Sequence, residues 1–416
     1  MSTAATPPAD GGAGPGREQE PSRGKTPRSA SAPDGGAAAD GRTAAESWAA
    51  ADSGAAPESG AAPSRTAAPD GGGAAVIGAG LMGHGIAQVL ACAGVPVAVF
   101  DASAESLATV HERVAASLAS IGVDAPAAEA AVRAIRAAGS LEEAVGGARW
   151  VFEAVPERLE LKRSLFAQLD AMAAPDAVLA TNTSVISVAE IAAQARRRQR
   201  ILGTHWWNPP YLIPLVEVVQ APDTDPAVVS RTIEFLTALG KTPVHVRRDV
   251  PGFVGNRLQH ALWREAFQLI DEGVCDPGTV DTVIRSGFGL RLPALGPVEN
   301  ADMIGLDLTL DIHSYILPRL TPPSRPSRTL ARLVADGRLG MKSGEGFLSW
   351  SEPDAERVRA RLRGHLLALA GSAAVRPPSA AGAVAQPAHA AGAAGRPAPA
   401  AGAADEPAPA AETTGG

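Results

Sequence analysis

Apolar residues divide the chain into a central region with periodic patterns and two terminal segments without them. Residues 1–73 and 372–416 consist largely of Ala, Gly, Pro and small polar residues, with almost no branched aliphatic side chains. Segments of this kind cannot bury enough apolar surface to offset the chain entropy that folding removes. We therefore expect residues 1–73 and 372–416 to be disordered tails. The central region is long enough for two domains with ordinary cores.

Between residues 74 and 248, short apolar runs alternate with segments of helical spacing. Such runs, of about four to eight residues, are typical of buried parallel strands. Helical structure is expected at 104–138 and 159–172, and strands are expected at residues 74–77, 97–100, 150–152, 178–180, 201–203, 215–219 and 243–246. The alternation predicts an α/β fold, in which residues 74–248 form a Rossmann-like, doubly wound, mostly parallel sheet.

After residue 248 the pattern becomes almost entirely helical. The expected helices span 254–271, 279–286 and 304–317, and a loop rich in Pro, Ser and Arg spans 321–328. Gly273 is placed to end the first of these helices. The pattern predicts an all-helical C-terminal domain at residues 249–352 and a terminal helix at 353–371.

Composition and charge exclude several classes of partner. The net charge of −7 at pH 7 provides no basic surface for nucleic acid. No apolar run reaches the roughly 20 residues that cross a bilayer, and the N-terminus lacks the apolar core of a secretory signal. The two cysteines lie far apart and outside any metal-ligand spacing. We therefore expect a cytoplasmic protein without a metal and without nucleic-acid or membrane partners.

A glycine-rich turn joins the first expected strand to the helix that follows it. Its residues are Gly78-Ala79-Gly80-Leu81-Met82-Gly83. In this context Gly78 permits a tight turn, Gly80 lets the backbone approach a pyrophosphate, and Gly83 allows helix and strand to pack closely. The positive end of the helix then faces the phosphates. We predict a dinucleotide site at Gly78, Gly80, Leu81, Met82 and Gly83.

An acidic residue, Asp101, ends the second strand, about 20 residues after the glycine-rich turn. A carboxylate there accepts hydrogen bonds from an adenosine ribose and repels a 2′-phosphate, which favours NAD over NADP. Two alternatives stay open at this point. The glycines form a simple turn while Asp101 caps the next helix, or the same turn binds a flavin.

Among the eight histidines, His205 is the best placed for acid–base chemistry. It ends an expected strand and precedes two tryptophans and a rigid Asn-Pro-Pro bend. Histidine can take the hydroxyl proton as a hydride leaves an alcohol, because its pKa lies near the working pH. Glu217 lies in the apolar strand 215–219, where a buried carboxylate needs a partner. We predict that Glu217 orients His205; the alternative is an edge histidine beside a solvent-facing acid.

Five further polar residues are candidate ligand contacts. Ser184, Asn208 and Asn256 each follow or begin an expected element, and their side chains could hold substrate oxygens. Isolated residues of these types are more often caps or turn residues. Glu157 and Lys162 follow the third strand and could contact the nicotinamide half of a cofactor. The alternative is that both are surface residues at the start of a helix.

A series of ordered segments matches a known family. The segments are the glycine-rich turn, Glu153-Ala154-Val155-Pro156-Glu157, Asn182-Thr183-Ser184, His205 through Pro209, Leu215-Val216-Glu217-Val218, Asp249 through Arg257, Gly296-Pro297 and Lys342 through Phe347. In these segments the chain resembles the 3-hydroxyacyl-CoA dehydrogenases, including 3-hydroxybutyryl-CoA dehydrogenase, over about residues 75–350. The number and order of the segments make the resemblance specific.

The resemblance implies an NAD-dependent enzyme whose helical domain forms a homodimer. The implied reaction is the oxidation of a (3S)-3-hydroxyacyl-CoA to a 3-oxoacyl-CoA, or its reverse, as in the β-oxidation of fatty acids. His205 would be the base and Glu217 its carboxylate partner. The resemblance further implies substrate contacts for Ser184 and Asn256, and contacts with the nicotinamide side of NAD for Glu157 and Lys162.

Two features depart from the family pattern. Trp206 and Trp207 follow His205, where the family often has phenylalanines. Residues 208–214 are similar to the gulonate 3-dehydrogenase and lambda-crystallin branch, and to carnitine dehydrogenases. These features favour a free hydroxy acid such as L-gulonate or carnitine, whereas residues 342–347 resemble the CoA-using branch. We expect a CoA thioester, with the free acid as the alternative and a non-enzymatic, crystallin-like protein as a third hypothesis.

Overall fold

The computed structural model describes residues 72–321 and 326–374. Within these residues, eight strands form one sheet in the order β3-β2-β1-β4-β5-β6-β7-β8. Neighbouring strands are parallel except β6 and β7, which are antiparallel. The strands are β1 Gly73–Ile77, β2 Val97–Phe100, β3 Ile135–Ala137, β4 Ala148–Glu153, β5 Val178–Thr181, β6 Ile201–Trp206, β7 Leu215–Val219 and β8 Thr242–Val246. The expected doubly wound, mostly parallel sheet is thus confirmed.

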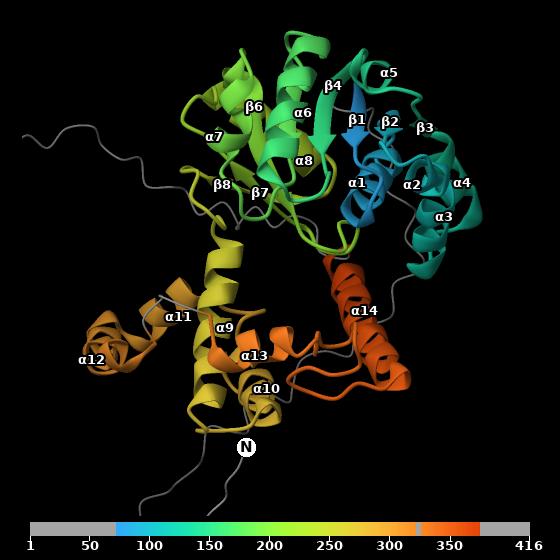
Figure 1. The fold of residues 1–416 in the computed structure, drawn as a ribbon. Helices are drawn as coiled ribbons and strands as arrows, with labels where there is room; N and C mark the ends of the chain where they lie inside the picture. Colours follow the sequence, from blue (N-terminus) through green and yellow to red (C-terminus); the bar gives the residue numbers. More distant parts are fainter. Residues whose placement is uncertain (1–71, 322–325, 375–416) are drawn as a thin grey trace, which may run out of the picture. The chain divides into compact units, whose positions relative to one another are not determined.

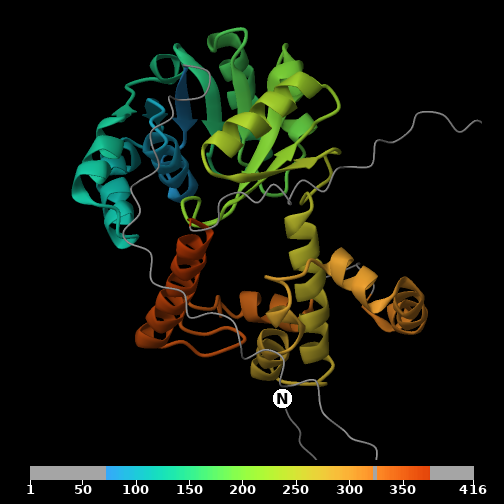
Figure 2. The ribbon, with the colours of Figure 1, turned by 180° about the vertical axis from the view of Figure 1, so that it is seen from behind.

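Helices cover both faces of this sheet (Figures 1 and 2). They are α1 Leu81–Cys92, α2 Ala104–Ala108, α3 Val110–Ser120, α4 Ala125–Arg133, α5 Leu141–Val145, α6 Leu159–Met172, α7 Val188–Ile191 and α8 Pro226–Ala238. Successive strand residues point to opposite faces. Ala74 and Val76 of β1 accordingly belong to one core with residues of α1, α3, α4 and α8, whereas Ala75 and Ile77 belong to a second core with α5, α6 and α7. Burial on both faces explains the continuous apolar runs of the strands.

The strand order places a ligand crevice at the carboxyl edge of the sheet. From β1 the sheet grows in both directions, to β2 on one side and to β4 on the other. Ligands of such sheets bind beyond the carboxyl ends of the strands at this switch point. Ile77, the last residue of β1, lies opposite Phe100 and Glu153, and Glu153 lies opposite Thr181. The turns that follow these residues therefore share one edge.

One of two local expectations was wrong. Residues 104–138, expected to be helical throughout, form three helices and the edge strand β3. Asp124 caps α4 through its side chain, which starts a new helix, and only Ile135 of β3 is buried. The helix expected at 304–317 is confirmed as α12, Leu306–Ile316; it starts after Gly305, whose φ of +101° separates it from a preceding helix that ends at Ile304.

The region after β8 is helical, as expected. Its helices are α9 Gly255–Asp271, α10 Pro277–Ser286, α11 Pro297–Ile304, α12 Leu306–Ile316, α13 Arg328–Ala335 and α14 Glu352–Ala374. The carboxylate of Asp271, at the end of α9, accepts hydrogen bonds from the amides of Arg328 and Thr329 at the start of α13. This contact holds α13 against α9, and the two helices lie side by side in both ribbon views.

Some expectations concern the ends of the chain, most of whose residues the structure does not describe. The expected tails, 1–73 and 372–416, lie outside the described residues except at their inner ends, where Gly73 belongs to β1 and residues 372–374 belong to α14. The domain boundaries at 248/249 and 352/353 stay predictions. In the described part of the chain, none of the helices combines the length and apolarity that crossing a membrane requires.

Candidate active site

His205 and Glu217 face each other across the antiparallel pair β6 and β7. The two residues are directly opposite in the strand register. Nδ1 of His205 lies 2.7 Å from Oε2 of Glu217, and both side chains are buried. An ionised carboxylate accepts hydrogen bonds only, so Nδ1 is the donor and Nε2 is the nitrogen able to take a proton. The pair therefore has the arrangement of a base oriented by an acid.

The second carboxylate oxygen of Glu217 is held by the start of α9. Oε1 accepts hydrogen bonds from the backbone amides of Val254, at 2.9 Å, and Gly255, at 3.0 Å. Burial alone raises the pKa of this carboxyl, but the hydrogen bonds from His205 and from the two amides hold the pKa below its usual value. Glu217 is therefore ionised near neutral pH, and it keeps the imidazole in one orientation.

The position of Gly255 depends on having no side chain. A Cβ there would overlap Cζ2 of Trp207 and come within 3.4 Å of Oε2 of Glu217. The ring of Trp207 in turn lies with its centroid 5.2 Å from that of His205. The indole thus packs against both the catalytic candidate and the helix end that holds its acid. By contrast, Trp206 is buried against Phe152 in the first core.

Two of the three predicted substrate contacts lie together. The side-chain amide of Asn256 donates to the backbone carbonyl of Ser184 at 2.9 Å, which links α9 to the turn after β5. In the same turn, the side-chain oxygen of Asn182 accepts from the amide of Trp206 at 2.9 Å. This hydrogen bond holds the turn against Trp206, the residue after His205. The third candidate, Asn208, lies three residues beyond His205 and precedes a cis peptide bond to Pro209.

The glycine-rich turn has the shape that a pyrophosphate requires. Gly78 adopts φ +104°, and a Cβ there would lie 2.6 Å from the carbonyl oxygen of Ala154. A Cβ on Gly83 would overlap the carbonyl oxygen of Gly78. At Gly80, the N-cap of α1, no atom lies within 4 Å of the position of a Cβ, so the backbone there is open to a ligand. Leu81, mostly exposed, and Met82, partly buried, begin the helix.

Asp101 binds the glycine-rich turn directly. Its Oδ2 accepts from the amide of Ala79 at 2.6 Å, and its Oδ1 accepts from the amide of Ser103 at 2.7 Å. The carboxylate thus lies beside the turn at the carboxyl edge of β2, where a ribose would bind. The guanidinium of Arg113, on α3, donates to the carbonyl of Ala79 and, at 2.9 Å, to that of Ser106. Arg113 could not be found from the sequence, because no local pattern indicates that its side chain contacts the glycine-rich turn.

Lys162 is buried, and it forms an ion pair with Glu157, which stays at the surface. Nζ of Lys162 lies 2.7 Å from Oε1 of Glu153 and 3.3 Å from Oε2 of Glu157, and the lysine is fully buried. Oε1 of Glu157 accepts from the Thr183 hydroxyl at 2.5 Å and from the Ser184 amide at 2.9 Å. The surface alternative is therefore wrong for Lys162. The expected contact of both residues with nicotinamide stays a prediction.

Glu153 is the centre of this network and was missed as a functional residue. Besides Lys162, it accepts hydrogen bonds from the Thr181 hydroxyl at 2.6 Å and from the Val155 amide at 2.8 Å. Burial raises the pKa of Glu153, and its bond to Lys162 opposes that shift. An acid directly after the apolar residues 150–152 was the available signal. The network ties the turn after β4 to the turn after β5, which carries Ser184.

Comparison with known proteins identifies the family. The sequence model of the 3-hydroxyacyl-CoA dehydrogenase NAD-binding domain matches residues 73–250, and the model of the C-terminal domain of the same enzymes matches residues 252–350. The chain belongs to the 3-hydroxyacyl-CoA dehydrogenase family. It is accordingly an NAD-dependent oxidoreductase, and the residues around Gly80 and Asp101 fit that cofactor.

Members of the family that resemble this dehydrogenase act on different substrates. It is 33% identical to a 5-formyl-3-hydroxy-2-methylpyridine 4-carboxylate 5-dehydrogenase of Mesorhizobium japonicum, over 71% of this chain and 96% of the relative. It is 36% identical to a 3-hydroxyadipyl-CoA dehydrogenase of Escherichia coli, over 66% and 58% of the two chains. An L-carnitine dehydrogenase of Pseudomonas aeruginosa is 40% identical, over 53% and 69%.

A solved structure agrees with this family assignment. The crystal structure of a 5-formyl-3-hydroxy-2-methylpyridine 4-carboxylic acid 5-dehydrogenase, described as an NAD+-dependent dismutase, superimposes with a TM-score of 0.68. It is 31% identical in sequence, and the match covers 73% of this chain and 99% of that one. The family is therefore settled by sequence and fold together, whereas the names of the relatives do not agree on a CoA substrate.

Proposed function

We propose that the enzyme oxidises the 3-hydroxyl of a (3S)-3-hydroxyacyl-CoA to a 3-oxoacyl-CoA, or runs the reverse reaction, as in the β-oxidation of fatty acids. The observation that supports this proposal is the buried pair of His205 and Glu217 at the carboxyl edge of the sheet. Nδ1 of His205 lies 2.7 Å from Oε2 of Glu217. Bound NAD would supply the acceptor for the hydride that leaves C3 of the substrate. Nε2 of His205 takes the hydroxyl proton, and the carboxylate of Glu217 stabilises the imidazolium that results.

The remaining site residues have proposed roles in binding. Ser184 and Asn256, which a hydrogen bond joins, would hold substrate oxygens near His205, together with Asn208. The turn of Gly78, Gly80, Leu81, Met82 and Gly83 would bind the pyrophosphate, and Asp101 would bind the adenosine ribose. Glu157 and Lys162 would lie on the nicotinamide side, where their network shapes the turn after β4.

The CoA thioester is the proposed substrate class, and a free hydroxy acid is the second candidate. The relative named 3-hydroxyadipyl-CoA dehydrogenase and the resemblance of residues 342–347 support the thioester. The relatives that act on a pyridine carboxylate or on carnitine support the free acid, as does the bulk of Trp207 against His205. L-gulonate and carnitine represent this alternative.

A substrate panel decides between the two classes. NAD reduction is measured at saturating NAD with (3S)-3-hydroxybutyryl-CoA, longer 3-hydroxyacyl-CoAs, L-gulonate and L-carnitine. We expect kcat/KM for a CoA thioester to exceed that for both free acids by at least about tenfold, a difference of roughly 1.4 kcal/mol in transition-state binding. The reverse order would replace the thioester by the free acid. Absence of turnover with every 3-hydroxy compound would favour the non-enzymatic hypothesis.

A histidine variant tests the mechanism separately. His205→Gln keeps a polar side chain of similar size but removes the base. We expect kcat to fall about 10²- to 10⁴-fold, with NADH affinity, measured by its fluorescence, unchanged. Wild-type kcat in this variant would remove His205 from the mechanism while leaving the substrate class untouched.

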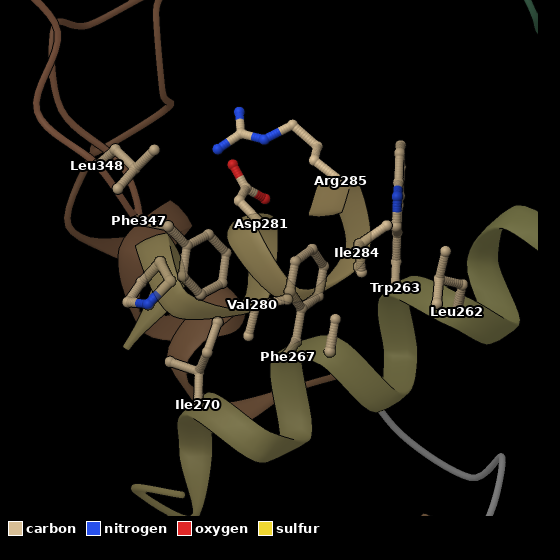
Figure 3. Close-up of a pocket in the computed structure, with 12 residues that line it drawn as sticks. Leu262, Trp263, Phe267, Ile270, Val280, Asp281, Ile284, Arg285, Phe347 and Leu348 are labelled. Carbon is tan, nitrogen blue, oxygen red and sulfur yellow. The ribbon is translucent and has the colours of Figure 1, made fainter. Parts of the chain in front are cut away.

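We further propose that the helical domain forms a homodimer and that the enzyme works in the cytoplasm. Helices α9 and α10, with Phe347 and Leu348, line an apolar groove of about 430 Å³ (Figure 3). Trp263 and Phe267 reach into it from α9, while Asp281 and Arg285 lie on its α10 side. We place part of the dimer contact at this groove, because its lining includes large exposed apolar side chains such as Trp263. The two cysteines are free thiols, which fits a reducing compartment.

A further inference from the structure

A single lysine anchors the loop that follows His205. Residues 207–214 connect β6 to β7, so the loop starts at the proposed catalytic strand and ends at the strand that carries Glu217. Nζ of Lys241, beyond the end of α8, donates to the carbonyl of Pro210 and, at 3.1 Å, to the carbonyl of Ile213. The same ammonium lies 5.4 Å from the ring centroid of Trp206. One cation thus holds the loop at two points and contacts the residue after His205.

The anchored loop also touches the cofactor helix. Cδ of Pro210 lies 2.9 Å from the position that a Cβ would occupy on Gly85, in the second turn of α1. The contact requires glycine at that position. Tyr211 packs against the first core, which includes residues of α1. The loop therefore connects the strand of His205 with the helix that begins at the glycine-rich turn.

Among the residues that the structure describes, no acid forms an ion pair with Lys241. None of the ion pairs among the described residues includes it. The surrounding elements carry Tyr211 in the loop, Glu234 on α8 and His245 on β8, and none of these three is hydrogen-bonded to it in the described structure. Burial without a counter-charge lowers the pKa of Lys241 to about 8. The ammonium is stabilised by the two carbonyls instead.

We propose that Lys241 is a positioning residue for the dehydrogenase reaction. Its ammonium fixes the 207–214 loop between the strand of His205 and helix α1, which keeps the base aligned with the dinucleotide turn. The inference rests on the proposed function of His205. A shift of about 1 Å in the reacting groups costs on the order of a hundredfold in rate, so a loosened loop lowers kcat without removing a catalytic group.

The charge on Lys241 makes this role testable through pH. Above about pH 8 the folded protein loses the proton from Lys241, whereas the unfolded chain keeps it up to the ordinary lysine pKa. Because the unfolded state then binds more protons, this group makes the fold more stable as pH rises through that window. A loss of activity above pH 8 through Lys241 is therefore not accompanied by a loss of stability from the same group.

The experiment compares the wild type with three kinetic variants and one variant for the emission measurement, all on the full chain. Lys241→Met removes the charge, Lys241→Arg keeps a cation that stays protonated, and Glu234→Gln, an exposed change on α8, is the matched control. For each, kcat, the KM of both substrates and the melting temperature are measured from pH 6.5 to 9.5. Tryptophan emission over the same range reports on Trp206, and Trp206→Phe identifies its share.

We expect Lys241→Met to lower kcat ten- to a hundredfold at pH 7, on the order set by misplacement of the base. Lys241→Arg should recover part of this loss. Wild-type kcat should decline with a midpoint near pH 8, with a matching change in Trp206 emission, and Lys241→Arg should show neither. Folded Lys241→Met with wild-type kcat, or a wild-type emission curve without a transition near pH 8, overturns the proposal.

The emission titration needs no turnover, so it separates this inference from the proposed function. If no 3-hydroxy compound is oxidised but the emission transition near pH 8 is present and absent in Lys241→Arg, the loop anchor stands and the proposed function fails. If turnover occurs and the transition is absent, the anchor fails alone. Should Lys241→Met not fold, the wild-type and Lys241→Arg curves still decide.

Discussion

The sheet region and the helical region use the same kinds of residue in opposite ways. In the sheet, strand residues such as Val76, Leu179 and Leu202 are fully buried, and buried ion pairs such as those of Glu153 and Asp170 lie among the elements that pack on it. Among the described apolar residues of α9 to α13, Ala266 and Leu333 are buried, whereas many large ones are exposed. The first region therefore completes its core with its own residues. The second has amphipathic helices whose apolar faces need cover from elsewhere.

The largest expected difference between the regions concerns their ion pairs. Asp170, on α6, is buried and binds Nη2 of Arg200 at 2.8 Å and Nε of Arg197 at 3.1 Å. Asp170→Asn leaves these guanidinium groups without their anion, so we expect a loss of about 3–5 kcal/mol in unfolding free energy. Urea denaturation measures it. The exposed pair of Asp354 and Arg357, on α14, is the control.

Asp354→Asn should leave unfolding unchanged within error, because solvent screens exposed pairs. A comparable loss of unfolding free energy in both variants would mean that the surface pair of the helical region stabilises the protein as much as the buried pair does. The two regions would then not differ in their ion pairs.

Replacing a glycine by alanine in each of the two regions is expected to have a smaller effect on the unfolding free energy. Gly83→Ala places a methyl group onto the carbonyl oxygen of Gly78, so α1 must move away from the turn. We expect a loss of about 3 kcal/mol, the upper part of the usual range for overpacking, with weaker NADH binding in a fluorescence titration. Gly364→Ala, on α14, meets no atom within 4 Å. It should stabilise the helix by up to about 1 kcal/mol, so equal losses at both sites would contradict the assignment of Gly83 to close packing.

Most of the fold could be predicted because its strands are buried on both faces. Continuous apolar runs such as residues 97–100 need no partner information to be recognised as strands. The strand β3 was missed since it lies at the sheet edge and buries only Ile135, so its three residues carry no pattern.

The site could be predicted where function requires a rare residue in a marked place. His205 and Glu217 stand out as a histidine before a rigid bend and an acid in an apolar strand, and the structure places their side chains 2.7 Å apart. Their roles in catalysis stay predictions. Lys241 could not be found in this way, because its partners are carbonyls 28 and 31 residues distant, and backbone carbonyls leave no mark in a sequence.

The exposed apolar residues of the helical region allow a direct test of whether a second copy covers them. Leu306 and Leu310 lie one turn apart on α12 and are 61% and 66% exposed. If a second copy covers this face, Leu306→Glu combined with Leu310→Glu buries two charges at the interface. We expect the dimer dissociation constant, measured by sedimentation, to rise at least about a hundredfold, since each buried, unpaired carboxylate costs more than the roughly 1.4 kcal/mol of a tenfold change.

The matched control is Met172→Glu, because Met172 is 41% exposed on α6 of the sheet region. A truly solvent-facing residue tolerates this change within about 0.5 kcal/mol, and the oligomeric state should not respond. If the α12 variant keeps the wild-type sedimentation and melting temperature, the apolar face of α12 is exposed to water in the native protein. The dimer contact would then lie at the groove of α9 and α10, and not at α12.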